Sequence, residues 1–377
     1  MKKIIVASDS FKGCMSSSEI GECIAVTTRK LFPEVEVTVL PISDGGEGLV
    51  ESVVKNGGFL RQEGTFCDPQ RQPLTAAAWA RREAEAVIEL AQCSGLGLCH
   101  PRNPALATTY GTGLQIKAAL DAGCQTIYLG LGGSGTHDGG CGIAAALGVR
   151  FFHQGKAFLP TGATLDQIEA LDLSDCELFN SGARLICLCD VTNPLFGTNG
   201  AAQVFARQKG ADEALIAQLD HNTEQLTRKV ETWQNCSLAA QPGLGAAGAC
   251  GLMLKGVFRC EIHSGLEQLL HWMRLDEQLT HADLIITGEG RIDSQSLQGK
   301  VPLGILHHAQ AANVPVLAVC GQLGIAKTAL LEAGFRDVLV LQKPSMSKQE
   351  SIRQAPRRLQ EEWTAWLKRN QSIDRER

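Results

Sequence analysis

The chain has 377 residues, more than one hydrophobic core usually serves, and 44% of them are hydrophobic, which is typical of a globular protein with two domains. Its formal net charge of −5 gives no reason to expect binding to nucleic acid or to an anionic membrane. The 40 glycines indicate many tight turns that bring backbone close to a ligand or to another segment, which favours an enzyme acting on a small molecule.

The fourteen cysteines predict buried, reduced thiols rather than disulfides or a zinc site. They are scattered along the chain and none forms a CxxC pair. The N-terminal stretch MKKIIVASD has too few apolar residues for the core of a signal peptide, and no run approaches the roughly 18 apolar residues of a membrane span. We therefore expect a cytoplasmic protein.

Seven short apolar runs, each bounded by Gly, Asp or Pro, predict strands that are buried on both faces. Helical patterns lie between many of them: Ser16 and Glu19 form a capping-box pattern at the start of one helix, and another helix ends at Gly123. This alternation predicts an α/β fold with a mostly parallel, three-layer Rossmann-like sheet. The seven runs are residues 3–7, 35–40, 126–131, 184–189, 283–288, 314–321 and 337–342.

The middle of the chain has mixed patterns, including two segments that we expect to be antiparallel strands, LTAAAWA at 74–80 and EAVIELA at 85–91. We therefore predict a discontinuous Rossmann-like domain, with a second, mixed α/β domain inserted into it. The expected limits are 1–55 with 275–377 for the first domain and 56–274 for the second. Near the C-terminus, the basic cluster 353–358 precedes two glutamates and is expected to be a solvated helix face.

Polar loops rich in glycine follow five of the predicted strands. Ligands of an open parallel sheet bind at the carboxyl ends of its strands, so these loops can converge on one cleft. The five loops are SDSFKG (8–13), PISDGGEG (41–48), GGSGTHDGG (132–140), DVTNPLFG (190–197) and GEGRIDSQSLQGK (288–300).

The glycine-rich stretch GLGGSG at 130–135 matches GxGxxG, but the next predicted segment, 149–160, has no acidic residue to bind a ribose, which argues against a dinucleotide. Backbone N–H groups in such a loop favour an anion, and phosphate is the expected guest. The Walker A pattern is missing, because Arg150 and Ser294 stand where its first glycine belongs. A serine hydrolase using Ser134 stays open as an alternative, although Thr136 replaces the last glycine of GxSxG.

Acidic residues outnumber basic ones in the five loops. So many carboxylates would repel a phosphate unless a divalent cation screens them, which is the usual circumstance of phosphoryl transfer with ATP and Mg²⁺. The acidic residues are Asp9, Asp44, Glu47, Asp138, Asp190, Glu289 and Asp293, and the basic ones are Lys12, Arg291 and Lys300.

We assign roles to these residues by their spacing. Lys12 and Arg291 are expected to neutralise the transferring phosphoryl group, and the isolated Asp190 is expected to act as the base that accepts the hydroxyl proton. The expected Mg²⁺ ligands are Asp44, Glu289 and Asp293, and the spacing leaves Asp9 and Asp138 open between metal ligand and base. The residues expected to bind substrate or phosphate are Asp9, Ser10, Gly45, Gly46, Gly132, Gly133, Ser134, Thr136, Asp138, Asn193 and Lys300.

With these segments assembled, the chain resembles the type I glycerate kinases, a bacterial family that phosphorylates glycerate with ATP. The resemblance implies that the small-molecule substrates are D-glycerate and ATP and that the product is 2-phosphoglycerate. A non-catalytic nucleotide-binding sensor is a further alternative. The matching segments are 9–13, 43–48, 108–113, 130–140, 190–197, 207–212, 243–251 and 283–304.

Three positions depart from the usual pattern of that family: Ser8 replaces Pro, His137 replaces Asn and Ala249 replaces Gly. His137 can bring a titrating charge into the site or serve as a neutral stand-in for the amide. Lys209, in RQKGAD, either reaches a phosphate or lies on the surface. The glycines of 243–251 let backbone pass close to a neighbouring element or to a ligand.

Overall fold

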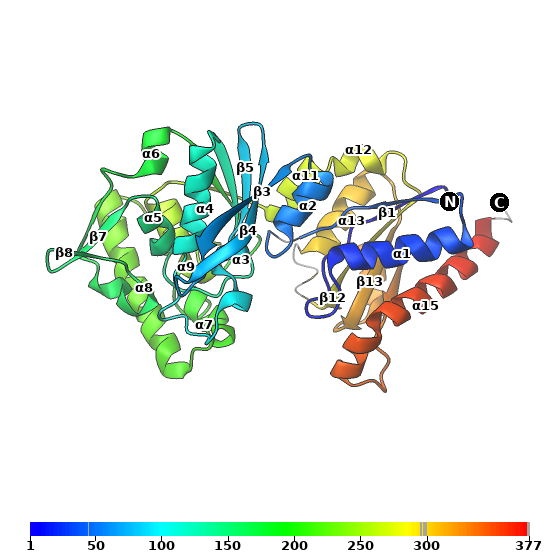
Figure 1. The fold of residues 1–377 in the computed structure, drawn as a ribbon. Helices are drawn as coiled ribbons and strands as arrows, with labels where there is room; N and C mark the ends of the chain where they lie inside the picture. The colour runs from blue at the N-terminus through cyan, green and yellow to red at the C-terminus, as the bar shows by residue number, and fades with distance from the viewer. Residues whose placement is uncertain (44, 295, 297–299, 375–377) are drawn as a thin grey trace. The chain divides into compact units, whose positions relative to one another are not determined.

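The computed structural model describes residues 1–43, 45–294, 296 and 300–374 (Figure 1). They form two compact units, which we call unit 1 (Met1–Asp44 with Leu266–Arg377) and unit 2 (Gly45–Gly265). The fold class is the predicted one: unit 1 has a parallel sheet and unit 2 has a mixed sheet, both with helices. The predicted domain limits, 1–55 with 275–377 and 56–274, stay a prediction.

Unit 1 is built on a five-stranded sheet with the order β14-β13-β12-β1-β2, in which every neighbouring pair is parallel. Its strands are β1 (Lys3–Val6), β2 (Glu36–Val39), β12 (Leu284–Ile292), β13 (Val316–Leu323) and β14 (Asp337–Val340). Its helices are α1 (Ser17–Leu31), α11 (Gly265–Trp272), α12 (Leu275–Leu279), α13 (Val301–Ala311), α14 (Lys327–Ala333) and α15 (Lys348–Asp374).

Both faces of this sheet are buried, as the continuous apolar runs predict. Ile4 and Ile286 pack into one core with α1 and α15, which lie side by side (Figure 1). The alternate residue Ile5 is equally buried and faces away from that core, where α13 contacts β12 and β13. The predicted capping box starts α1: the Ser16 hydroxyl accepts from the Glu19 N–H at 3.2 Å, and the Ser16 N–H donates to the Glu19 carboxylate at 2.7 Å.

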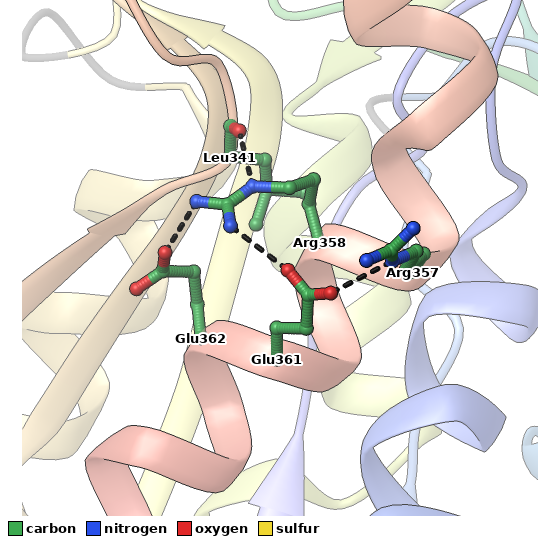
Figure 2. Close-up of polar contacts among 5 residues, drawn as sticks. All are labelled: Leu341, Arg357, Arg358, Glu361 and Glu362. Carbon is green, nitrogen blue, oxygen red and sulfur yellow. Dashed lines mark hydrogen bonds and ion pairs between the residues drawn. The ribbon is translucent and has the colours of Figure 1, made fainter.

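The basic cluster of α15 is not wholly solvated, which corrects the expectation for 353–358. Arg358 is only 7% exposed. Its guanidinium donates to the carbonyl of Leu341, just after β14, and to the carboxylates of Glu361 and Glu362 on its own helix (Figure 2). Its neighbour Arg357 stays exposed and pairs with Glu361. Arg358 is buried because α15 packs against the sheet, and it holds the helix to the end of β14.

Unit 2 has a six-stranded sheet with the order β11-β10-β6-β5-β4-β3 and a small antiparallel sheet β8-β7-β9. The first four strands are parallel, while β4 runs antiparallel to β5 and β3, as expected for the two middle segments. Its strands are β3 (Leu60–Cys67), β4 (Pro73–Arg82), β5 (Glu85–Glu89), β6 (Thr126–Gly130), β7 (Arg150–His153), β8 (Lys156–Phe158), β9 (Ala170–Asp172), β10 (Arg184–Leu188) and β11 (Glu261–His263).

The helices of unit 2 pack around a core of their own, centred on residues such as Ile127, Leu129 and Cys187. The α-helices are α2 (Leu49–Asn56), α3 (Ala91–Ser94), α4 (Tyr110–Asp121), α5 (Cys141–Ala146), α6 (Glu177–Ser181), α7 (Ala201–Phe205), α8 (Glu213–Gln234), α9 (Ala246–Ala249) and α10 (Gly251–Gly256). The 3₁₀ helices are η1 (Leu96–Leu98), η2 (Gly162–Gln167) and η3 (Arg207–Lys209). None of the helices in the described part of the chain has the length and hydropathy of a membrane span.

The five polar loops follow strands of two different sheets, and their convergence on one cleft stays a prediction. The loops at 8–13 and 288–300 belong to unit 1, those at 132–140 and 190–197 belong to unit 2, and 41–48 crosses the limit between the units. The reason is pairing: β6 and β10 pair with each other and with strands of the inserted segment, not with β1 or β12.

Candidate functional site

Unit 1 has a cavity of about 510 Å³ at the carboxyl ends of its strands. It is lined by residues that follow β1, by the end of β12, by Gln322 of β13 and by Gln342 after β14. These strands are neighbours in the parallel sheet, and the carboxyl edge of such a sheet is where ligands bind. The volume lies in the range of small-molecule sites.

The first polar loop places Asp9, Ser10 and Lys12 at this cavity. The Asp9 N–H donates to the Gly288 carbonyl at 2.9 Å, which continues the pairing of β1 with β12, and the Asp9 carboxylate accepts from the Ser10 N–H at 2.6 Å. The chain then makes a tight turn closed by hydrogen bonds between Phe11 and Met15, with exposed Lys12 inside it. This turn separates the end of β1 from the start of α1.

Glu289 and Arg291 lie inside β12, not in a loop after it, which corrects the predicted strand end at residue 288. The pairing continues because Glu289 lies opposite Cys320 and Arg291 opposite Gln322 of β13. Side chains two apart share one face of a strand. Glu289 and Arg291 therefore point to the same side, and Asp293, the residue after the strand, lines the cavity with them. The Arg291 Nε lies 3.6 Å from an Asp293 carboxylate oxygen.

The acidic residues of this cavity fit Mg²⁺ held together with a substrate phosphate. Across the described residues, no group of three His, Cys, Asp or Glu side chains lies together as a protein-only metal site would require. Mg²⁺ commonly uses one or two carboxylates and completes its shell with water and phosphate oxygens. Glu289 and Asp293 supply carboxylates in that number, and Asp44 lies outside the described residues.

Two further lysines and an apolar wall complete the cavity. Lys300 is the residue before α13, and Lys348 is the first residue of α15. Phe11, Ile352 and Ala355 form apolar lining near them. Lys348 is a site residue that the sequence did not indicate, because no motif marks the start of the helix that carries it.

In unit 2, glycines that were predicted to bind a ligand allow the loops at 41–48 and 132–140 to approach each other closely. The Gly132 N–H donates to the Gly45 carbonyl at 3.2 Å, and a Cβ on Gly132 would lie 2.2 Å from the Cα of Gly46. Any side chain there would therefore separate the loops. Gly133 is exposed and has a positive φ of 73°, with the Glu47 carboxylate beside it. The backbone packing explains Gly45, Gly46 and Gly132 without a ligand, and their binding role stays a prediction.

Asp138 is fully buried and its carboxylate holds two segments together. It accepts hydrogen bonds from Thr108, from the N–H and hydroxyl of Thr109, and from the N–H groups of Gly140 and Gly142. Burial raises the pKa of Asp138, and the backbone N–H of Thr109 acts against that rise. These contacts explain the TTYGTG segment and give Asp138 a positioning role. These contacts do not support the prediction that Asp138 binds substrate or phosphate, which stays a prediction.

Ser134 and Thr136 meet Lys209, which is 2% exposed. The Lys209 ammonium donates to the Ser134 hydroxyl at 2.8 Å and to the Thr136 carbonyl at 2.7 Å. Lys209 is therefore not a surface residue. The motif RQKGAD drew attention to Lys209 in the sequence. Only the tertiary contact with Ser134 shows that this lysine is buried and does not lie at the solvated start of a helix.

His137 is fully buried and neutral. Its Nε2 lies 3.1 Å from the Thr223 hydroxyl, and burial together with the Lys209 charge lowers the pKa of His137 to about 3. Of its two interpretations from the sequence, the neutral stand-in for an amide is the one that the structure supports.

The glycine run 243–251 passes close to a neighbouring loop. A Cβ on Gly248 would lie 2.1 Å from the Thr136 carbonyl oxygen, so a side chain there would not fit. Ala249, where the family pattern has Gly, has a positive φ of 64°.

Asp190 follows β10 and is exposed. One of its carboxylate oxygens accepts from the Ser264 hydroxyl at 2.7 Å and from the Gly265 N–H at 3.1 Å, which fixes its orientation. Asn193, three residues on, donates to the Asn199 carbonyl at 2.9 Å and accepts from the Gly245 N–H through its backbone carbonyl. The side-chain amide of Asn193 thus shapes the loop after β10.

Comparison with known proteins identifies the family. The model of the "Glycerate kinase family" matches residues 4–369. The chain is 38% identical to a glycerate kinase of Bacillus cereus over 94% of both chains, and 36% identical to a glycerate 2-kinase of Escherichia coli K12 over 85% of both. A crystal structure described as glycerate kinase 2 from Salmonella typhimurium LT2 superposes with a TM-score of 0.81 at 33% identity, covering 98% of this chain and 99% of that one. The chain therefore belongs to the glycerate kinase family and is an enzyme of the kinase class.

Proposed function

We propose that this enzyme transfers the γ-phosphoryl group of ATP to the C2 hydroxyl of D-glycerate, with Mg²⁺ bound to the nucleotide, and releases 2-phosphoglycerate and ADP. The observation that carries the proposal is the unit 1 cavity, where four cationic side chains line the same space as three carboxylates. That combination suits a polyphosphate with a divalent cation and suits neither a neutral ligand nor a bare anion. The four cationic residues are Lys12, Arg291, Lys300 and Lys348.

In this proposal, unit 1 binds the donor nucleotide. Lys12 and Arg291 stabilise the charge that develops on the transferring phosphoryl group, and Lys300 and Lys348 bind the remaining phosphates. Glu289 and Asp293 would hold Mg²⁺, together with Asp44. When bound, Mg²⁺ neutralises phosphate charge and screens the carboxylates from it. The apolar wall of Phe11, Ile352 and Ala355 is suited to the nucleotide base.

Asp190 is the proposed base for the acceptor. Its carboxylate takes the proton of the glycerate hydroxyl as that oxygen forms a bond to the γ-phosphorus and the bond from the γ-phosphorus to the leaving ADP oxygen breaks. The hydrogen bonds from Ser264 and Gly265 hold one oxygen in place, and Asp190 is exposed on the surface of unit 2.

The reaction is tested by steady-state assay of the purified chain with ATP, MgCl₂ and D-glycerate, following ADP. We expect turnover that requires all three. No ADP formation with glycerate or with other three-carbon and four-carbon hydroxy acids would overturn the proposal. Phosphorus NMR of the product tests the position, since 3-phosphoglycerate alone would overturn the C2 assignment and leave the reaction class standing.

Two further measurements, of ATP binding and of covalent labelling, test the other functions that the sequence left open. A nucleotide-binding sensor would bind ATP without turnover. A serine hydrolase would react with a fluorophosphonate at Ser134, and the 2.8 Å contact between Lys209 and Ser134 is the one observation in its favour. Membership of a kinase family favours phosphoryl transfer over both.

A further inference from the structure

Unit 2 contains a buried lysine, Lys209, that forms no ion pair with a carboxylate of the described residues, although the charge of Asp138 acts on it. The side chain of Lys209 is 2% exposed, and among the described residues no carboxylate oxygen lies within 4.0 Å of its ammonium. The two groups that accept its hydrogen bonds, a hydroxyl and a carbonyl, are both uncharged. Burial lowers the pKa of Lys209 to about 8, which leaves most of the lysine protonated at neutral pH.

A buried charge without a counter-ion is costly, because the solvation it loses is not replaced by an opposite charge. An ammonium group also has three N–H donors, and within the described chain only two of them have acceptors, on Ser134 and Thr136. The arrangement is therefore incomplete by one hydrogen-bond acceptor. The charge of the buried Asp138 carboxylate raises the pKa of Lys209, but Asp138 accepts no hydrogen bond from its ammonium. A small anion supplies the missing acceptor together with a negative charge in direct contact.

Ser134 connects this charge to solvent. Its oxygen accepts the Lys209 hydrogen bond, so its own proton is directed to another acceptor. Ser134 is half-buried and stands next to the exposed Gly133, whereas Thr136 on the other side is fully buried. An anion that reaches the loop at 132–136 would meet the Ser134 hydroxyl first, with the lysine charge directly behind it.

We infer that Ser134 and Lys209 form the subsite for the carboxylate of the hydroxy acid substrate. This inference rests on the proposed function for the identity of the acceptor and deepens it. From the sequence, Ser134 was expected to bind either substrate or phosphate, and the inference assigns it to the carboxylate of the acceptor. Lys209 was expected either to contact a phosphate or to lie on the surface, and the inference adds it to the same subsite. Ser134 donates to a carboxylate oxygen, and the Lys209 ammonium balances the charge through the shared hydroxyl and, by its third N–H, directly.

The charges around the loop favour a carboxylate over a phosphate. One ammonium matches one carboxylate, whereas a phosphoryl group with nearly two negative charges needs more cations or a metal ion. The neighbouring charges increase this preference, because the Glu47 carboxylate lies beside Gly133 and Asp190 follows the adjacent strand. The cationic residues suited to phosphate are gathered in the unit 1 cavity instead.

The position of the loop also fits a three-carbon acid. The loop follows β6 and Asp190 follows β10, and these strands are parallel neighbours, with Gly130 opposite Leu188. Neighbouring strands lie about 4.8 Å apart. A substrate whose carboxylate binds at Ser134 therefore extends its hydroxyl-bearing carbon toward the strand end that carries the proposed base. Recognition and proton acceptance then come from two adjacent strand ends of one unit.

The test compares D-glycerate with D-glyceramide, which has the same hydroxyls but no negative charge. Calorimetric titration of the full chain without nucleotide measures each Kd, so the result does not depend on turnover. We expect Ser134→Ala and Lys209→Met each to weaken glycerate binding about 10- to 100-fold, the range for a hydrogen bond to a charged group. Glyceramide binding is expected to change less than about 2-fold, because it lacks the charge.

Lys229→Met is the matched control, since this half-buried lysine of α8 also donates to two carbonyls, those of Asp166 and Ile168, away from the loop. It should leave both Kd values unchanged. If Lys209→Met does not fold, as judged by thermal melting, the half-buried Ser134→Ala variant still decides the inference. Equal weakening for acid and amide, or no change for either, would overturn it.

Two further outcomes separate this inference from the proposed function. If both variants turn over glycerate and still distinguish it from glyceramide as the unaltered chain does, the carboxylate subsite is wrong and the kinase reaction is unaffected. Glycerate binding that depends on Ser134 and Lys209 in a chain without kinase activity would support the subsite and sink the reaction. Fluorophosphonate labelling of Ser134 that is lost in Lys209→Met would assign the pair to a nucleophile and overturn the subsite.

Discussion

Lys12 and Arg291 come from different strand ends and line the same cavity, which is the arrangement expected of two groups that act on one phosphoryl group. Replacing either by Ala is expected to lower kcat by about 10²-fold or more, the effect of losing one preorganised electrostatic group. Both side chains are exposed, so the melting temperature should stay within a few degrees. Steady-state kinetics and thermal melting measure the two effects.

Lys30→Ala provides the control, because Lys30 is an exposed lysine near the end of α1 and does not line the cavity. Its kcat should match that of the unaltered chain. Near-complete turnover by Lys12→Ala would show that the turn between Phe11 and Met15 is structural only.

Asp293 and Asp190 have different surroundings, and a Mg²⁺ titration distinguishes their roles. Asp293 shares the cavity with Arg291 and Glu289, whereas Asp190 is held by Ser264 and Gly265 in unit 2. Asp293→Asn should raise the Mg²⁺ concentration needed for half-maximal activity, and excess Mg²⁺ should partly restore the rate. Asp190→Asn should lower kcat with an unchanged Mg²⁺ requirement, because a base is not replaced by metal.

The decisive quantity is the Mg²⁺ concentration at half-maximal rate in each variant. Rescue of Asp190→Asn, with no rescue of Asp293→Asn, would require the assignments of base and metal ligand to be exchanged.

Helix α15 forms one wall of the cavity through Lys348, Ile352 and Ala355, and Arg358 secures it one turn further on. Arg358→Ala removes hydrogen bonds to Leu341 and to two carboxylates and leaves space in a packed interface. The free energy of unfolding is expected to fall by about 2–3 kcal/mol.

Arg357→Ala is the paired control, since the Arg357 side chain is 77% exposed and its removal should change stability by less than about 0.5 kcal/mol. Urea denaturation measures both. Equal effects of the two changes would contradict the role given to Arg358 in holding α15 to the end of β14.

His308 of α13 joins three helices by contacts with Asp276 of α12 at 2.6 Å and Glu267 of α11 at 3.0 Å. Partial burial by itself lowers the pKa of His308, but the hydrogen bonds that its ring donates to the two carboxylates outweigh burial and raise the pKa above its usual value. A raised pKa in the folded state stabilises the fold below the unfolded pKa of about 6.5, and this contribution is lost as pH rises through the folded pKa.

We therefore expect His308→Gln to destabilise the protein more at pH 5.5 than at pH 8.5. His307→Gln, a change of the exposed neighbour on the same helix, controls for the loss of a histidine, and the effect of His308→Gln is measured relative to it. Denaturation of each variant at the two pH values gives the difference, and an effect of His308→Gln that grows with pH would contradict the assignment.

The two units have separate sheets and separate cores, so their ligands can be assigned by local protection. Hydrogen exchange of the full chain is expected to slow in residues 9–15 and 288–294 on adding a non-hydrolysable ATP analogue with Mg²⁺. D-glycerate alone should slow exchange in residues 132–137 and 189–193. Protection of the opposite unit by either ligand would contradict the division between donor and acceptor sites.

Much of the fold could be predicted from the sequence because the signals are local. The seven apolar runs are all strands, and the Ser16 and Glu19 pattern caps α1 as predicted. Strand ends were less predictable: β12 continues through Glu289 and Arg291 although glycines flank them, because pairing with β13 compensates for their low strand propensity.

By itself, the sequence determined which residues can carry the chemistry: the loops that follow the strands, their carboxylates and cations, and the family that has them in this order. Only the tertiary structure decided which of them lie together. It placed the loops on two sheets, buried Lys209 against Ser134, 75 positions away along the chain, and buried Arg358 within a basic run. The physical reason is that strand neighbours and burial depend on contacts between distant segments, whereas apolar runs and helix caps depend on residues a few positions apart.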